Sequence, residues 1–202
     1  MYNGVLWVIG GDDGTLQNDV WSSPDGENWT EVASTAAWSA RKGHTSVVHN
    51  NLMWVIGGWD GSYYNDAWCS SDGANWTEVT SAGDFGARNW HSSAVFNNLI
   101  WVIGGHDGSL VNDVWSSPDG GSWTEVTSGA GFSARYLHTS VVYYGLMWVM
   151  GGYDVSNSND VWSSPDGANW TEVTSGAPWS ARNNQVSVAY NGHMWVMGGH
   201  DG

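Results

Sequence analysis

A repeat of 47 residues, for example from Gly10 to Gly57, runs through the 202-residue chain and restricts its fold more than any other feature. Two glycines, one Arg and one Trp return at this step in every copy. The glycine pairs begin at Gly10, Gly57, Gly104, Gly151 and Gly198, the arginines are Arg41, Arg88, Arg135 and Arg182, and the tryptophans are Trp29, Trp76, Trp123 and Trp170. A period of this length indicates supersecondary units that pack against their neighbours.

One period is predicted to contain four short strands. Residues 44–50 (HTSVVHN) are rich in β-branched side chains, and residues 52–58 (LMWVIGG) are apolar on both faces. Residues 65–71 and 75–79 give the third and fourth strands, and Asn-Asn and Asp-Gly turns separate the pairs. Short connections predict an antiparallel meander, which at this period is the signature of a propeller blade. We therefore expect an all-β fold of about four blades in a single domain, residues 1–202.

Composition agrees with stacked sheets and excludes several partners. The chain has 17 Trp, which supply flat packing area, and 28 Gly, which let strands bend. A formal net charge of −15 repels phosphate backbones and anionic membranes, so we expect no nucleic acid or membrane partner. No apolar run reaches the roughly 20 residues of a spanning helix, and no leader peptide is expected. The single cysteine, Cys69, allows no internal disulfide.

Two local patterns resemble known propeller families. The segment MWVIGG, followed by ND and by a Trp about 18 residues after the Gly pair, resembles the kelch repeat. This chain departs from the usual kelch Tyr by carrying Trp7, Trp54, Trp101, Trp148 and Trp195. The turn SSPDGENW is similar to the Asp-box hairpin of sialidase-type propellers but lacks the residue that usually stands between Asp and Gly. Both resemblances imply a β-propeller, and neither brings a catalytic residue.

The two ends of the repeat raise the question of ring closure. The kelch resemblance implies six or seven blades, whereas this sequence contains about four and both begins and ends in a second strand. The first blade could pair with the last inner strand to close a ring. Otherwise the sequence is a piece of a longer propeller, or a half that assembles with another copy. Because open blades leave strand edges unpaired, we expect self-association, such as a homodimer, or an unusually small ring.

Comparison of the copies with one another points to one face for a ligand. Turns between the third and fourth strands barely differ, whereas the loops at the opposite end vary and gain aromatic side chains. The predicted ligand-binding residues there are Trp59, Tyr63, Tyr64, Trp90, His106, Tyr136 and Tyr153. Drift in unconstrained loops would produce the same variation. The two explanations differ in whether these rings converge into one patch.

The repeated arginines have two possible roles. Arg41, Arg88, Arg135 and Arg182 could form a positive ring that attracts an anionic peptide or sugar acid. Alternatively, each could bridge blades by pairing with the Asp of the ND motif or with backbone carbonyls, as the regular spacing favours. The aromatic residue three positions earlier is expected to pack between blades; the set is Trp38, Phe85, Phe132 and Trp179.

Histidine and aspartate repeats are weak candidates for metal binding. His44, His91 and His138 share one position and could hold a metal around an axis, but buried, hydrogen-bonded histidines are the favoured explanation. Each copy has one Asp after its Gly pair that could bind Ca²⁺, yet too few acids cluster. We therefore expect no metal site and no cofactor.

The polar side chains recur symmetrically in every repeat, which favours a structural role, because an active site needs a unique set of residues at one place. No Ser-His-Asp order, Cys-His pair or phosphate loop stands out, so no catalytic residue is predicted. The sequence favours a non-enzymatic module that binds a protein or a glycan. The alternative is a purely structural, self-assembling propeller, amplified recently or constructed, with no evolved ligand. The compartment is left unassigned, with an extracellular or cell-surface setting favoured.

Overall fold

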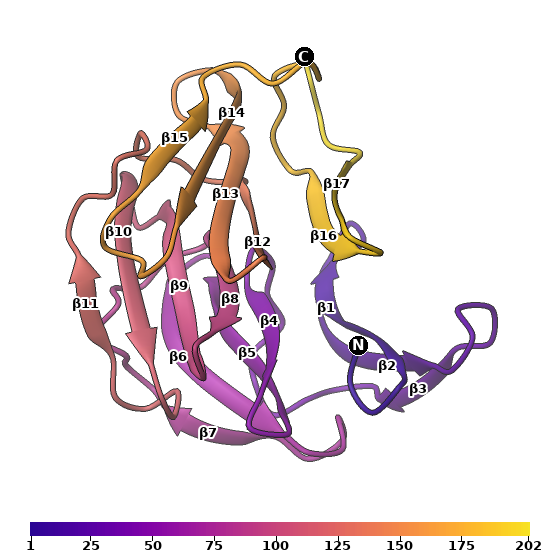
Figure 1. Ribbon diagram of the computed structural model, residues 1–202. Coiled ribbons are helices and arrows are strands. Elements are labelled where there is room, and N and C mark those ends of the chain that lie inside the picture. The colour runs from indigo at the N-terminus through magenta and orange to yellow at the C-terminus, as the bar shows by residue number, and fades with distance from the viewer.

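The computed structural model describes residues 1–202, and all of its regular elements are β-strands. Seventeen strands form five antiparallel sheets, which we call blades 1 to 5 in chain order (Figure 1). No helix long and apolar enough to cross a membrane occurs in the structure. The all-β prediction is thus confirmed.

Blades 2 to 4 are four-stranded and run A-B-C-D in sequence order. Blade 2 contains β4 (Thr45–His49), β5 (Leu52–Trp59), β6 (Tyr63–Ser70) and β7 (Thr77–Thr80). Blade 3 contains β8 (Ser92–Phe96), β9 (Leu99–His106), β10 (Leu110–Ser117) and β11 (Thr124–Thr127). Blade 4 contains β12 (Thr139–Tyr143), β13 (Leu146–Tyr153), β14 (Asn157–Ser164) and β15 (Thr171–Thr174).

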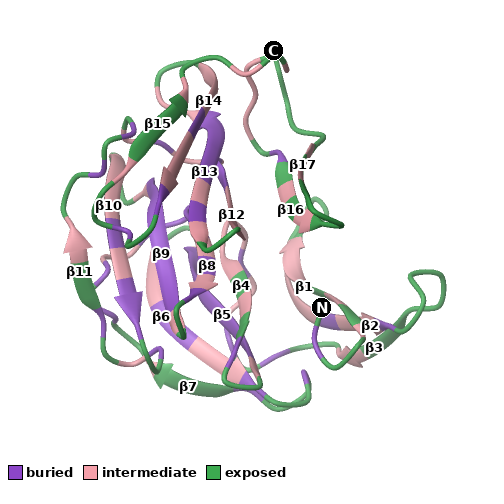
Figure 2. Cartoon of the chain, viewed as in Figure 1, coloured by how far each residue is buried: buried purple, intermediate pink, exposed green.

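The blades at the two ends are smaller. Blade 1 has strands B, C and D, which are β1 (Leu6–Asp12), β2 (Leu16–Ser23) and β3 (Thr30–Ala33). Blade 5 has strands A and B, which are β16 (Val186–Tyr190) and β17 (His193–Met197). The A strands β4, β8, β12 and β16 lie next to one another, and the D strands are the outermost and most exposed (Figure 2).

The glycine pair forms a bulge within each B–C pairing. In blade 2 the register between β5 and β6 shifts between Ile56 and Gly58. Gly57 and Gly58 have φ angles of 61° and 110°, which L side chains rarely adopt. A Cβ on Gly58 would also lie 2.9 Å from the Cβ of His44. Glycine is therefore required at Gly58 for two reasons, the positive φ angle and the lack of space for a Cβ. The bulge directs strand B outward to the loop.

Tryptophan on strand B locks each blade onto the next. The Trp101 ring of blade 3 covers Gly167 in the C-to-D turn of blade 4, where a Cβ would lie 2.2 Å from the ring. Trp54 covers Gly120, and Trp7 covers Gly73, in the same way. Three apolar clusters, each spanning two neighbouring blades, form the core. The core is thus between the sheets, as blade stacking requires.

The same C-to-D turns are organised by one aspartate each, as the Asp-box resemblance implies. In blade 2 the Asp72 carboxylate accepts the N–H groups of Ala74 and Asn75 at 2.9 and 2.8 Å. The Ser70 hydroxyl accepts the N–H of Gly73 at 2.8 Å. The Asn75 side-chain amide donates to the other Asp72 carboxylate oxygen at 2.8 Å, and the hydrogen bonds from Asn75, its side chain first, lower the pKa of Asp72 to about 2. The invariant turns are therefore structural.

Closure of a ring through blade 1, one of the alternatives that the sequence left open, does not occur in this structure. Strand β16 pairs with β17, and β1 pairs with β2 alone among the named strands. The pairing of β16 with β17 is local, because only a two-residue turn separates the two strands. Closing this short loop costs less conformational entropy than bringing β16 to β1 at the other end of the chain. The blades therefore form an open arc (Figure 1).

Candidate ligand-binding face

The variable loops lie at one end of the blades, and hydrogen bonds hold them firmly. In the D-to-A loop after blade 2, Gly83 donates its N–H to the Asn65 carbonyl at 2.7 Å. The Asn65 side chain returns a bond to the Gly83 carbonyl at 2.6 Å, and Arg88 donates its N–H to the Tyr64 carbonyl at 2.9 Å. Equivalent bonds recur at Asn18, Asn112 and Asn159. The loops are therefore rigid platforms rather than loose connections.

A series of backbone hydrogen bonds joins successive D-to-A loops along the arc. Trp90 donates its N–H to Gly43, Leu137 to Trp90, and Asn184 to Leu137, at 2.8, 3.0 and 2.8 Å. All four residues have left-handed backbones, with φ angles of 66° at Gly43, 50° at Trp90, 55° at Leu137 and 57° at Asn184. This conformation suits glycine or asparagine and is strained for a bulky residue. Trp90 and Leu137 are strained residues at a loop surface, where such strain is often functional.

Five of the predicted ligand-binding residues form one aromatic cluster, which spans blades 2 to 4. Tyr63 lies 5.6 Å from His106 between ring centroids, and its hydroxyl is 2.9 Å from Nδ1 of that histidine. Tyr136 contacts His106, Trp90 and Tyr153 at centroid distances of 5.9, 5.4 and 5.6 Å. All five side chains are half-buried. The rings therefore converge, as the binding explanation predicts.

Two other predicted residues lie apart from this cluster. Trp59 faces Lys42, whose Nζ is 5.6 Å from the ring centroid. Tyr64 lies under the Arg41 guanidinium at 4.0 Å and donates its hydroxyl to Asp60 at 2.7 Å. Their expected place in loops was also wrong: Trp59 ends β5, and Tyr63 and Tyr64 begin β6, because the hairpin turns over only residues 60–62.

Lys42 is a residue on this face that the sequence pattern did not single out. It forms an ion pair with Asp12 of blade 1 at 2.7 Å, and its backbone bridges to Trp59 of blade 2. The signal available in the sequence was its uniqueness, since it is the single lysine of the chain. Both ends of the pair are about one-third exposed, so it contributes little stability.

Three of the four arginines bridge blades, the role that their regular spacing favoured, so the alternative placement of these three in a ligand-binding ring is wrong. Arg41, Arg88 and Arg135 form bidentate pairs with Asp66, Asp113 and Asp160, each with a shortest distance of 2.6 Å. Their side chains are 1–2 % exposed, which leaves no access for a ligand. Arg182 is half-buried, has no aspartate partner and donates to the Gly198 carbonyl.

Each arginine belongs by its backbone to the loop of one blade and by its side chain to the next. The Arg135 backbone N–H bonds to Val111 of blade 3, and its guanidinium reaches Asp160 of blade 4. Burial by itself raises the pKa of Asp160, but hydrogen bonding and charge from Arg135 outweigh this and lower it. The two side chains therefore form an ion pair that links neighbouring blades. Phe132, three residues earlier, is 1 % exposed and packs there as expected.

The repeated histidines line an axial cavity of about 390 Å³ together with Ser and Thr side chains of the A strands. Nε2 of His138 lies 2.9 Å from the Ser92 hydroxyl, and Nε2 of His91 lies 3.0 Å from the Thr45 hydroxyl. Gln185 takes the same position in blade 5 and donates to the Met150 carbonyl at 2.8 Å. No group of three or more His, Cys, Asp or Glu side chains is arranged to hold a metal. The favoured hydrogen-bonded role of the histidines is the one observed.

Acidification is expected to destabilise the fold through these histidines. Burial lowers the pKa of His138 to about 3 and that of His44 to about 4, and it lowers the pKa of His91 as well. Because the unfolded chain titrates near 6.5, it binds more protons than the folded chain below that pH. Stability is therefore full above about pH 6.5 and falls on acidification by about 1.4 kcal/mol per pH unit per histidine, until the folded pKa is reached.

Urea unfolding between pH 7.5 and pH 4.5 measures this slope. A His138→Gln variant provides the control, because Gln185 occupies the same repeat position and forms a buried hydrogen bond there without a titrating group. We expect the variant to have a shallower slope than the unchanged chain. Equal slopes would contradict the prediction. The hydrogen-bonded aspartates of the turns, whose pKa values are lowered, lose their contribution only below about pH 4 and stay outside this window.

A family model described as the KLHDC2/KLHL20/DRC7 Kelch-repeats domain matches residues 1–152. No curated protein matches the chain.

Proposed function

Because the chain belongs to the kelch-repeat family, we propose that it is a non-enzymatic binding domain that holds a protein ligand on the D-to-A and B-to-C face. Kelch repeat domains are commonly protein-interaction modules. The aromatic cluster on this face is the observation that carries the proposal. Tyr63, Trp90, His106, Tyr136 and Tyr153 come from three successive repeats, yet their rings form one contiguous group. Half-buried aromatic side chains of this kind anchor protein interfaces.

The backbone at Trp90 adds a second reason. Glycine occupies the same position in the preceding repeat, as Gly43, and fits the left-handed conformation without strain. A tryptophan with φ of 50° costs on the order of 1–3 kcal/mol at such a position. This strain supports a ligand contact only together with the position of the ring, because Trp90 belongs to the aromatic cluster, whereas Tyr144, strained in the same way, lies at the opposite end of blade 4.

The test starts from peptides selected on the unchanged chain by display of a random library. Each selected peptide is then titrated against the Trp90→Gly variant by calorimetry. We expect the dissociation constant to rise at least about tenfold, as for an interface anchor, while the midpoint of thermal unfolding stays the same or rises.

Tyr144→Gly is the matched control. Tyr144 is also an aromatic residue with a left-handed backbone, at φ of 48°, and it is 80 % exposed in the A-to-B turn at the opposite end of blade 4. Its loss should leave the affinity of every selected peptide unchanged. Peptides that are insensitive to Trp90→Gly, or equally sensitive to both variants, would sink the proposal for this face. A glycan array probed with the same proteins tests whether the rings stack on sugars instead. Sugar binding by the unchanged chain that is lost in Trp90→Gly would indicate that the ligand of this face is a glycan and not a protein.

A further inference from the structure

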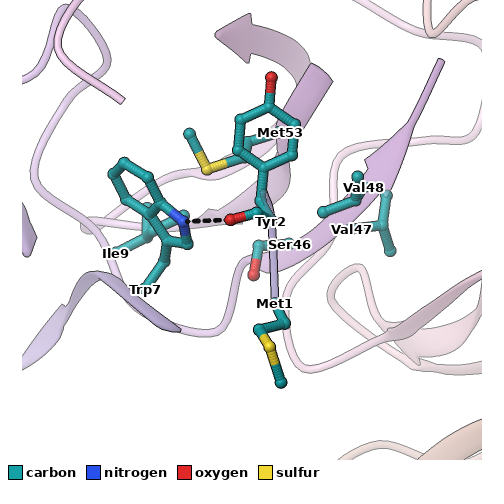
Figure 3. Close-up of a pocket in the computed structure, with 8 residues that line it drawn as sticks. All are labelled: Met1, Tyr2, Trp7, Ile9, Ser46, Val47, Val48 and Met53. Atoms are coloured by element: carbon teal, nitrogen blue, oxygen red, sulfur yellow. Dashed lines mark hydrogen bonds between the residues drawn. The ribbon is translucent and has the colours of Figure 1, made fainter. Parts of the chain in front are cut away.

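An apolar groove lies between β1 of blade 1 and β4 of blade 2, away from the aromatic cluster. We call it the seam groove; Met1, Tyr2, Trp7, Ile9, Val47 and Met53 line it (Figure 3). Its volume is about 150 Å³, and seven of its eight lining residues are hydrophobic. In blades 2 to 4 the corresponding position beside strand B is filled by strand A. In blade 1 one edge of β1 has only the isolated Tyr2–Val5 bridge beside it.

The strand β16 at the other end of the chain has the sequence and exposure that fit this groove. Val186, Val188 and Tyr190 are 59 %, 42 % and 70 % exposed. In blade 3 the residues at the same positions are Ser92, Ala94 and Phe96, which are at most 7 % exposed. These positions are therefore the face that an A strand buries against the following blade, and in β16 nothing covers it.

The partner of β16 in this structure closely resembles β1. Strand β17 and strand β1 share the pattern of an apolar residue, Trp-Val, another apolar residue and the Gly pair, with Trp195 at the position of Trp7. In β16–β17, Val186 lies opposite Met197 and Val188 opposite Trp195. The same register would place Val186 opposite Ile9 and Val188 opposite Trp7. Exchange of β17 for β1 would keep the ladder pairs of Val186, Ser187 and Val188 and add the contacts of the groove, whereas Val5, opposite Tyr190 in this register, is already paired with Tyr2.

Charges at the two ends are complementary. Asp19 is the one aspartate of its repeated series, which otherwise contains Asp66, Asp113 and Asp160, that forms no ion pair with an arginine. Arg182 is correspondingly the one arginine of its series without an aspartate. In the inner blades the arginine that precedes strand A pairs with the aspartate on strand C of the same blade. Arg182 precedes β16, and Asp19 lies on the C strand next to β1.

We propose that the seam groove binds β16 of a second copy of this chain, so that β16 pairs with β1 and Arg182 forms an ion pair with Asp19 of the other copy. Each copy offers both halves of the junction, so two identical junctions close a symmetric dimer. The chain's own β16 is held beside β12 and paired with β17, and does not pair with β1. This association uses neither the aromatic cluster nor any ligand, so it stands independently of the proposed binding function.

Charge reversal tests the junction. Sedimentation equilibrium on the unchanged chain is expected to show a dimer of the 21.9 kDa chain. Asp19→Arg places two arginines at each junction, and Arg182→Asp places two aspartates there, so each variant alone should dissociate at least about tenfold more readily. An equimolar mixture of the two variants pairs Arg with Asp at both junctions and should recover the dimer. The Glu125→Arg variant, which makes the same charge change on the exposed strand β11, should stay dimeric.

The outcomes separate the alternatives. A monomeric unchanged chain, or a dimer indifferent to both charge reversals, would overturn the proposal. Pairing of β16 with β1 of its own chain gives a different result. The double variant Asp19→Arg/Arg182→Asp would then restore the junction as a monomer, whereas the mixture of the two single variants would not restore it. Far-UV circular dichroism confirms that each variant is folded before its mass is interpreted.

A cysteine pair tests the register without altering charge. Ser46 and Val55 are opposite each other in blade 2, and Ser187 and Val8 occupy the equivalent positions of the proposed junction. Chains that carry Val8→Cys or Ser187→Cys, both with Cys69→Ser, are mixed and oxidised; serine at position 69 matches the other repeats. A disulfide-linked dimer is expected, because the Cα atoms of opposed residues lie within bridging distance. Replacement of Val8→Cys by Leu6→Cys moves the thiol two residues out of register, and equal cross-linking there would refute the pairing.

Discussion

Replacement of Trp101 by alanine is expected to lower the free energy of unfolding by about 3–5 kcal/mol, in line with large deletions in packed cores. The Trp101 ring is 4 % exposed and belongs to the apolar cluster between blades 3 and 4. Its Nε1 donates a hydrogen bond to the Phe96 carbonyl at 2.9 Å, which alanine cannot replace. The ring also covers Gly167 so closely that no other residue fits beneath it. The variant therefore creates a cavity between the blades and removes the contact between strand B and the C-to-D turn of the next blade.

Trp195→Ala is the matched control for this prediction. Trp195 occupies the same repeat position in blade 5, but it is 49 % exposed and covers no glycine of a following blade. Its loss should cost less than about 1 kcal/mol. Urea unfolding followed by circular dichroism measures both variants, at a protein concentration low enough that association between copies does not contribute. Similar losses in the two variants would show that stacking onto the next blade is not what makes Trp101 important.

Local sequence signals were sufficient to predict most of the fold. Strands β4 and β5 lie within one residue of the predicted ranges 44–50 and 52–58, because apolar pattern and turn residues act over a few positions. The third strand begins earlier than predicted, at Tyr63 rather than at residue 65. Its start depends on the register of the B–C hairpin beyond the glycine bulge, and that register is not visible in composition.

The candidate site was predicted in part, for a similar reason. Variation among the repeats selected seven aromatic residues, of which five contact one another in the structure, but it did not indicate which of them meet. Tyr63, His106 and Tyr136 come from different blades, so their contact depends on how successive blades are rotated. The sequence also left the arginines with two roles, because equal spacing serves an exposed ring and a buried bridge alike. Only the packing shows that the guanidinium of Arg41 is enclosed between blades.

Loss of the buried ion pair between Arg88 and Asp113 is the second large effect that we expect. The guanidinium of Arg88 contacts both carboxylate oxygens of Asp113, at 2.6 and 2.8 Å, and donates to the Gly104 carbonyl at 3.0 Å. An Arg88→Met variant keeps much of the side-chain volume but leaves the Asp113 charge, 16 % exposed, with only the Trp115 indole N–H as a side-chain donor. Removal of one partner from a buried pair typically costs about 3–5 kcal/mol.

Two comparisons separate the charge effect from the loss of packing. Arg182→Met makes the same change at the same repeat position, where the side chain is half-buried and has no aspartate, and should cost less than about 1 kcal/mol at low protein concentration. Addition of Asp113→Asn to Arg88→Met removes the stranded charge while retaining an acceptor for Trp115, so the double variant should be more stable than Arg88→Met alone. If the double variant is instead the less stable of the two, the stabilisation at this position comes from packing and hydrogen bonds, and the ionised bridge is not what holds neighbouring blades together.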